Sequence, residues 1–197
     1  MSYLIQAAVT LVQFVIGLYL LIVLLRFLLQ LVRADFYNPV SQALITLTNP
    51  PLKILRRFIP GFAGIDWPSI ILLLLIQIIE ICLLALLLTG HLPTVPGVIV
   101  LSVAKLSKLT AYVFMFLIFI SVIISWINPG AYNHLTILIY QLLDPLMRPI
   151  RRRIPPMGSL DLSPMVALLF IYLFLILFVA PLQDWGNRLS GYSLRLL

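Results

Sequence analysis

Long apolar runs separated by short polar stretches dominate the chain. Charged side chains are absent from residues 1–25, from 69–91 apart from Glu80, from 109–129 and from 162–183. A helix of about 20 apolar residues crosses the hydrocarbon core of a bilayer, which is about 30 Å thick. We therefore predict four transmembrane helices, near Val9–Leu31, Ile70–Thr89, Leu109–Ile127 and Met165–Leu182.

The composition excludes a soluble domain. Hydrophobic residues make up 62% of the chain, the mean hydropathy is +1.15, and only 10% of the residues are charged, against roughly 25% in soluble domains. The 197 residues suffice for four spans and short loops. The sequence thus predicts an all-α membrane protein. Because Arg26 is the first charged residue, no signal-peptide pattern is present, and the first span is expected to remain.

An internal repeat appears when the sequence is compared with itself at an offset of about 95 residues. The matching pairs, without a gap, are Tyr37-Asn38 with Tyr132-Asn133, Pro50 with Pro145, Arg56-Arg57 with Arg151-Arg152, Ile59-Pro60 with Ile154-Pro155, and Asp66 with Asp161. We predict two repeats, 1–95 and 96–197, each a helix–loop–helix unit. Because each holds two spans, the repeats share one orientation, with a pseudo-twofold axis along the membrane normal.

The two loops have helical periodicity. Apolar residues recur at i, i+3, i+4 and i+7 in both loops, at Val40, Ala43, Leu44 and Leu47 and at Leu135, Leu138, Ile139 and Leu142. Asn49-Pro50 and Asp144-Pro145 then place a capping side chain before a proline, the start signal of a further helix. The sequence therefore predicts short amphipathic helices in each loop.

Basic residues form a stripe in each loop at i, i+3 and i+4. The stripes consist of Lys53, Arg56 and Arg57 and of Arg148, Arg151 and Arg152, with Arg153 added. Each cation at a membrane surface contributes about 1 kcal/mol of attraction to anionic lipid. The stripes are interpreted as orientation signals alone or as a lipid- or partner-binding surface; nucleic acid is not expected, because no aromatic residues are interleaved.

Two further pairs of polar residues have candidate roles. Asp66 and Asp161 precede the second and fourth spans, where they cap a helix or pair with a loop arginine; an ion site would require the two to converge. Within the apolar runs, Arg26 and Glu80 lie at comparable depths. We predict an intramembrane pair, the alternative being that Arg26 extends to the interface and Glu80 is protonated or faces water.

Neither a metal site nor a cofactor site is predicted. His91 and His134 are isolated, and Cys82 is the only cysteine. No nucleophile, base or metal constellation is recognisable, so no enzyme activity is expected.

The distribution of cations predicts the orientation. The loops carry eight basic residues, Arg33, Lys53, Arg56, Arg57, Arg148, Arg151, Arg152 and Arg153, and the other side carries Lys105, Lys108, Arg188 and Arg195. Since cytoplasmic loops are enriched in Lys and Arg, both termini are expected in the periplasm.

Taken together, the motifs resemble those of the YggT family, also called YlmG, and most closely its proteobacterial inner-membrane members. The resemblance covers nearly the whole chain and is carried by Asn38-Pro39, Arg56-Arg57-Phe58-Ile59-Pro60, Gly64-Ile65-Asp66, the run from Asp144-Pro145 to Pro155, and Ser163-Pro164. The second copy departs from it at His134 and Ser159. The resemblance implies roles in osmotic stress tolerance, including cation uptake, and proximity to cell-division genes; in plastids it implies cytochrome maturation and nucleoid distribution. It implies no catalytic residue.

Two functions remain open. The first is a non-enzymatic inner-membrane factor that supports osmotic or envelope stress tolerance and binds anionic lipid, a membrane-protein partner or its own copies. The second is a small oligomeric channel or carrier for a cation, with Arg26, Gln30, Gln77 and Glu80 along a polar path.

Overall fold

Helices account for nearly all of the computed structural model, which describes residues 3–35, 37–62, 64–127, 133–154 and 161–191. Tyr132, Pro155 and Ser159 of the repeated motifs lie outside these ranges. The helices are α1 (Tyr3–Leu31), α2 (Pro39–Phe58), α3 (Trp67–Thr89), α4 (Val95–Ile127), α5 (His134–Arg153), α6 (Ser163–Phe174), a π-helical turn η1 (Leu175–Val179) and α7 (Ala180–Ser190). The all-α prediction is confirmed.

Within the described residues, four helical segments are long and apolar enough to cross a membrane. They are α1, α3, α4 and the rod formed by α6, η1 and α7, at Ser163–Ser190. These match the four predicted spans but extend further at most ends, because a helix continues past the hydrocarbon boundary as long as its backbone hydrogen bonds are made. The chain is a multi-pass membrane protein.

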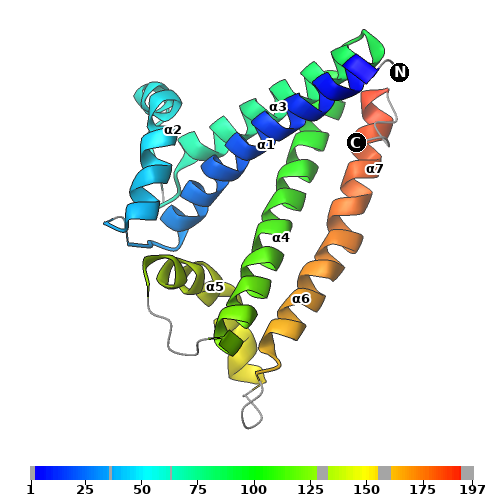
Figure 1. Ribbon diagram of the computed structural model, residues 1–197. Helices are drawn as coiled ribbons and strands as arrows, with labels where there is room; N and C mark the ends of the chain where they lie inside the picture. Colours follow the sequence, from blue (N-terminus) through cyan, green and yellow to red (C-terminus); the bar gives the residue numbers. More distant parts are fainter. Residues whose placement is uncertain (1–2, 36, 63, 128–132, 155–160, 192–197) are drawn as a thin grey trace.

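The four long helices form two pairs (Figure 1). One pair consists of α1 and α3, and the other of α4 and the α6–α7 rod; both termini lie at the same end, and the loop helices α2 and α5 lie at the opposite end. Each half thus runs helix, loop helix, helix in the same direction, as the predicted parallel repeat requires. The boundary between the repeats near residue 95 stays a prediction.

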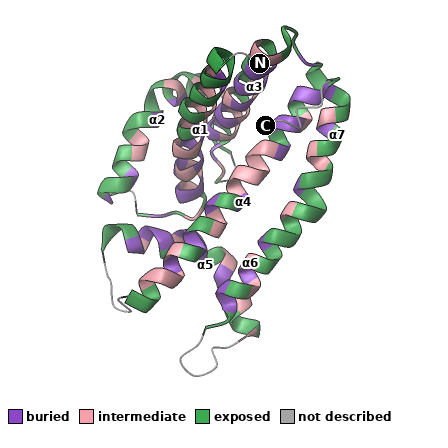
Figure 2. Ribbon diagram, turned by 45° about the vertical axis from the view of Figure 1, so that its right-hand side comes forward, coloured by how far each residue is buried: buried purple, intermediate pink, exposed green. Residues whose placement is uncertain are grey.

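The core lies where the helices meet. Fully or almost fully buried residues include Val23 and Leu24 of α1, Leu52 of α2 and Ile118 of α4. On the outward faces of the rods, Figure 2 shows mostly exposed residues, and large apolar side chains such as Phe178 are among them. An apolar exterior is the surface that suits lipid chains.

Each loop helix is longer than predicted. In the part of each loop that the structure describes there is one helix, with Pro50 and Pro51 inside α2 and Pro145 and Pro149 inside α5. The predicted second start at Asn49-Pro50 and Asp144-Pro145 is therefore wrong. An interior proline removes one hydrogen bond and bends a helix without having to end it, and Figure 1 shows α2 changing direction along its length.

The start signals lie earlier in the loops. Asn38 accepts a hydrogen bond from the Val40 amide at 2.9 Å, and Asn133 accepts from the amides of Leu135 and Thr136. Asn38 also donates to the His134 carbonyl at 2.6 Å. The two loop helices therefore begin beside one another, at equivalent asparagines of the two repeats.

Small residues let α4 and α7 approach closely near the end that holds the termini. A Cβ atom added to Gly97 would lie 2.4 Å from the Ser190 backbone, and one added to Gly186 would lie 2.8 Å from the Leu101 side chain. Glycine at helix contacts is typical of membrane bundles, because it brings the backbones together. The α4–α7 contact thus depends on both glycines.

Candidate functional site

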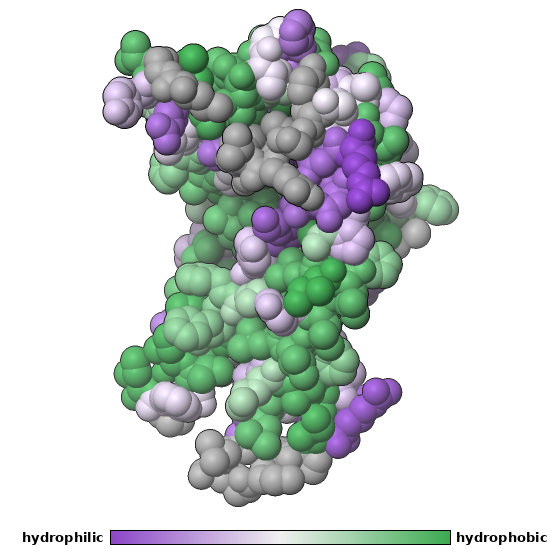
Figure 3. Space-filling view, turned by 90° about the vertical axis from the view of Figure 1, so that its right-hand side faces the viewer, coloured by the Kyte–Doolittle hydropathy of each residue, from purple (hydrophilic) through white to green (hydrophobic). Residues whose placement is uncertain are grey.

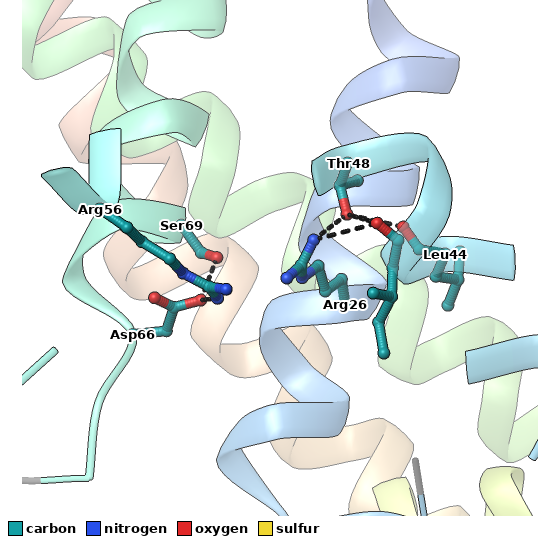
Figure 4. Close-up of polar contacts among 7 residues, drawn as sticks. Arg26, Leu44, Thr48, Arg56, Asp66 and Ser69 are labelled. Atoms are coloured by element: carbon teal, nitrogen blue, oxygen red, sulfur yellow. Dashed lines mark hydrogen bonds and ion pairs between the residues drawn. The ribbon is translucent and has the colours of Figure 1, made fainter. Parts of the chain in front are cut away.

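The first repeat joins its loop helix to the next span through a buried aspartate (Figure 4). An Nη of Arg56, in the last turn of α2, donates to the Asp66 carboxylate at 2.8 Å, and the Ser69 hydroxyl donates to the same oxygen at 2.6 Å. Asp66 directly precedes α3 and is only 4% exposed. Of the two predicted roles for Asp66, the structure shows pairing with a loop arginine.

The second repeat makes the same pair at the equivalent positions. Arg151 of α5 lies 3.0 Å from the Asp161 carboxylate, which also accepts a hydrogen bond from the Ser163 amide at 2.9 Å. The side chain of Asp161 is 33% exposed. Burial alone would raise the pKa of this carboxyl, but the hydrogen bond from the Ser163 amide and the charge of Arg151 outweigh it and hold the pKa below its usual range.

The remaining basic residues of the stripes divide into two groups. Arg148 pairs with Asp144 one turn earlier, at 2.7 Å. The others are exposed and make no ion pair or side-chain hydrogen bond with any residue that the structure describes: Lys53, Arg57, Arg152 and Arg153. Three of the seven predicted lipid-binding residues are therefore neutralised by a carboxylate, and four remain as free charges at the loop end.

Arg26 binds the loop helix of its own repeat. One of its Nη atoms donates to the Thr48 hydroxyl at 2.5 Å and to the Ile45 carbonyl at 3.3 Å, and Thr48 in turn donates to the Leu44 carbonyl at 2.6 Å (Figure 4). Arg26 is 5% exposed. The contacts fix α2 against α1 through a charged group that is removed from solvent.

The predicted pair of Arg26 and Glu80 is not formed. Glu80 is 8% exposed and accepts a hydrogen bond from Gln77 one turn earlier in α3. Among the described residues, no ion pair links it to Arg26. The physical reason is that α2 folds back on α1 and offers Arg26 oxygen acceptors nearer to the loops.

Glu80 lines a cavity of about 420 Å³ between α1, α3, α4 and α7. Its polar lining is Gln77, Glu80, Lys105, Lys108, Tyr112, Gln183, Asp184 and Asn187. On the face turned toward the viewer in Figure 3, hydrophilic residues gather in the half nearer the termini, whereas the lower half is mostly hydrophobic. The predicted span ended at Leu182, so the polar residues of α7 were not connected with Glu80; their spacing of three and four residues was the available signal.

The cavity carries charges of both signs. Glu80 and Asp184 are acidic, Lys105 and Lys108 are basic, and Lys108 lies over the Tyr112 ring with its Nζ 5.7 Å from the ring centre. Within the described residues, no group of three His, Cys, Asp or Glu side chains is arranged to hold a metal ion. The arrangement can bind a polar molecule, and it offers no nucleophile and base in contact.

Comparison with known proteins gives the family. The family model described as CCB3/YggT matches residues 5–87 and again residues 100–182, so that the two matches are displaced by the offset of the internal repeat. An uncharacterized protein of Pseudomonas aeruginosa is 45% identical over 85% of this chain and 85% of its own.

Two further relatives support the same family assignment. The uncharacterized protein YggT of Escherichia coli is 34% identical over 89% of this chain and 90% of its own, and an uncharacterized protein of Haemophilus influenzae is 37% identical over 82% and 84%. No solved structure matches the chain. The twofold match and these relatives show that the chain belongs to the CCB3/YggT family.

Proposed function

We propose that this chain is a non-catalytic protein of the bacterial inner membrane that binds anionic lipid headgroups through α2 and α5 and supports tolerance of osmotic or envelope stress. One observation carries the proposal. The equivalent pairs Arg56–Asp66 and Arg151–Asp161 tie the ends of both loop helices to the next spans, while neighbouring cations on the same helices stay unpaired. The paired arginines position the helices, and the unpaired ones meet the lipid.

The unpaired cations supply a moderate attraction. At about 1 kcal/mol for each cation near an anionic surface, Lys53, Arg57, Arg152 and Arg153 together give about 4 kcal/mol. Salt reduces this value, because exposed charges are screened beyond about 8 Å at physiological ionic strength. Binding of this kind selects anionic headgroups over neutral ones and weakens as salt rises.

The proposal includes an orientation with α2 and α5 in the cytoplasm and both termini in the periplasm. The excess of Lys and Arg in the two loops supports this orientation. Of two reporters fused to the C-terminus, the one that works in the periplasm should be active and the one that works in the cytoplasm should not. The opposite result would contradict this orientation.

The decisive variant neutralises only the unpaired cations: Lys53→Gln, Arg57→Gln, Arg152→Gln and Arg153→Gln. The matched control, Asp144→Asn with Arg148→Gln, removes an exposed ion pair of α5 without changing the net charge. We expect the quadruple variant, and not the control, to lose bound cardiolipin and phosphatidylglycerol in native mass spectrometry. Growth after a salt upshift, at matched membrane abundance, should fall in the same variant. Unchanged lipid binding and growth would reduce the stripes to orientation signals.

A second candidate, a cation carrier, is favoured by one specific observation. Two acidic residues, Glu80, which is buried, and Asp184 line the cavity between the spans. Purified protein in liposomes should then pass a monovalent cation, and Glu80→Gln should abolish the flux. Absence of flux above protein-free liposomes would remove this candidate and leave the lipid-binding proposal untouched.

A further inference from the structure

The charged residues that line the cavity beside Glu80 are not conserved between the two repeats. At the offset of 95, Leu175 takes the place of Glu80, Thr10 that of Lys105 and Gln13 that of Lys108. The polar lining therefore comes from side chains that are particular to one copy. Because these charged residues occur in one copy alone, a structural role common to both copies does not explain them.

Several polar groups of the cavity have unused bonding capacity. The Oδ1 atom of Asn187 is buried and has no hydrogen-bond partner among the described residues. Gln77 is the one described donor to the Glu80 carboxylate. Neither Lys105 nor Lys108 forms an ion pair with a carboxylate of the described chain. Glu80 is 8% exposed and the Asn187 Oδ1 atom is buried, and such groups are costly to bury with few partners, whereas both lysines are half-buried and free to turn toward a ligand; a bound molecule that completes these bonds is therefore favoured.

The cavity extends from the interior of the spans, where Glu80 lies about 20 Å from the start of α3, to about one membrane thickness from the loop end. At 1.5 Å per residue, Lys108 is about 28 Å from the Ile127 end of α4, and Gln183 is about 30 Å from the Ser163 end of the fourth span. Because the hydrocarbon core is about 30 Å thick, these residues lie where it gives way to headgroups on the side of the termini. The ring of Trp185, which is exposed on α7, fits this level.

We propose that this cavity binds a zwitterion that carries an ammonium group and an anionic group. Its ammonium is met by the acceptors Glu80, Asp184 and Asn187, and its anionic group by the donors Lys105 and Lys108. A bare cation would face both lysines, and a bare anion would face both carboxylates, so a ligand with both charges matches the lining best. The volume of about 420 Å³ is in the range of small-molecule sites.

This chemistry has two sources, the headgroup of phosphatidylethanolamine and a free amino acid. The inference concerns binding, does not depend on α2 or α5, and holds whether or not the cavity is a path for transport. The probes are phosphoethanolamine and glycine, with ethanolamine and inorganic phosphate as single-charge controls. Binding is measured by calorimetry on the full chain in detergent, and lipid retention by native mass spectrometry from membranes of mixed phosphatidylethanolamine and phosphatidylglycerol.

Two variants separate the site from the fold. Glu80→Gln keeps an acceptor for Gln77 and removes the charge; Gly17→Phe fills the cavity, since nothing lies within 4 Å of a Cβ atom at Gly17. The matched control is Leu18→Phe, which adds an aromatic ring to the neighbouring, exposed position of α1. We expect Glu80→Gln to weaken binding of the zwitterion about tenfold or more, Gly17→Phe to abolish it, and Leu18→Phe to leave it unchanged.

The outcomes distinguish the two sources and the failure of the proposal. Saturable binding of glycine identifies a free amino acid, and retention of phosphatidylethanolamine that Gly17→Phe removes, Glu80→Gln weakens and Leu18→Phe leaves unchanged identifies the lipid. The proposal is overturned if ethanolamine or phosphate binds as tightly as phosphoethanolamine, or if neither zwitterion binds and lipid retention is the same in all variants. The quadruple variant of the loop helices must retain the zwitterion, because it leaves the cavity intact.

Discussion

The two repeats make the same ion pair in different surroundings. In the first, Asp66 is almost excluded from solvent and accepts hydrogen bonds from Arg56 and Ser69. In the second, Asp161 and Arg151 are both partly exposed. A buried carboxylate depends on its partner, whereas an exposed pair contributes little. The same sequence motif therefore contributes differently to the free energy of unfolding in the two repeats.

A second difference lies beneath the loop helices. In the first repeat Arg26 binds Thr48, whereas the equivalent positions in the second repeat hold Ser121 and Leu143. Ser121 donates to a carbonyl of its own helix, and Leu143 is buried in the core. One repeat thus attaches its loop helix through a buried charge, and the other through apolar packing.

The largest effect is expected when the buried pair is broken. Arg56→Ala should lower the free energy of unfolding by about 3 kcal/mol, because it leaves the Asp66 carboxylate buried without its cation. Arg151→Ala should cost less than about 1 kcal/mol, because solvent replaces the lost partner. Reversible unfolding in mixed micelles measures both. Equal losses in the two variants would mean that burial does not set the difference.

A glycine in each repeat extends the comparison to the spans. Gly97→Ala should cost about 2–3 kcal/mol, because the new Cβ would overlap the Ser190 backbone and force α4 and α7 apart. Gly17→Ala should be neutral or stabilising by up to about 1 kcal/mol, since alanine favours the helix and the space is open. The same unfolding assay applies, and a stable Gly97→Ala variant would contradict the close α4–α7 contact.

The attachment of α2 can be converted into that of α5. Thr48→Leu alone should cost about 2 kcal/mol, because buried Arg26 loses a hydrogen bond to its charge. Adding Arg26→Ser, which copies the second repeat, should recover about 1–2 kcal/mol of that loss.

As a control, the effects of Arg26→Ala and Glu80→Ala should add within about 0.5 kcal/mol, because the two residues do not pair. Strong coupling between Arg26 and Glu80 would restore the pair predicted from the sequence.

The smallest effect concerns pH and the exposed pair. The pKa of Asp161 is lowered on folding, so its charged form stabilises the protein above the usual value near 3.8, and this contribution disappears as the pH falls through the lower, folded pKa. Asp161→Asn should therefore flatten the acid side of the stability curve below about pH 4, by less than about 1 kcal/mol. An unchanged slope would show that the carboxyl gains nothing on folding.

The sequence predicted what depends on local pattern. The four spans follow from apolar run length and the repeat from its ungapped offset, and a loop arginine was one of the two alternatives predicted for Asp66 and Asp161 from their place just before a span. The predicted extent of α2 is wrong, because Pro50 lies inside the helix and bends it instead of starting a new one. The predicted partner of Arg26 is wrong. The contact that Arg26 makes depends on how α2 folds back on α1, and no local sequence pattern contains that information.

The cavity was beyond sequence reasoning for a similar reason. It joins α1, α3, α4 and α7, and its α7 residues follow the point where the predicted span ended. Glu80 and Gln77 were singled out as polar residues in an apolar run, but the groups that face them come from a separate span. Only the packing of the four rods brings them to one place.

The π-helical turn η1 changes the phase of the fourth span. Its residues, Leu175–Val179, begin at the position equivalent to Glu80, where α3 continues as a regular helix. A π turn takes up one residue more than an α turn, so every later side chain is rotated by about 100° about the helix axis. The repeat keeps its numerical offset along the chain, yet the side chains of α7, Asp184 and Asn187 among them, are rotated from the phase that an uninterrupted α-helix would give them. One wider turn, with no residue inserted in the sequence, is enough to turn the residues after it toward a different interior in one copy of the motif.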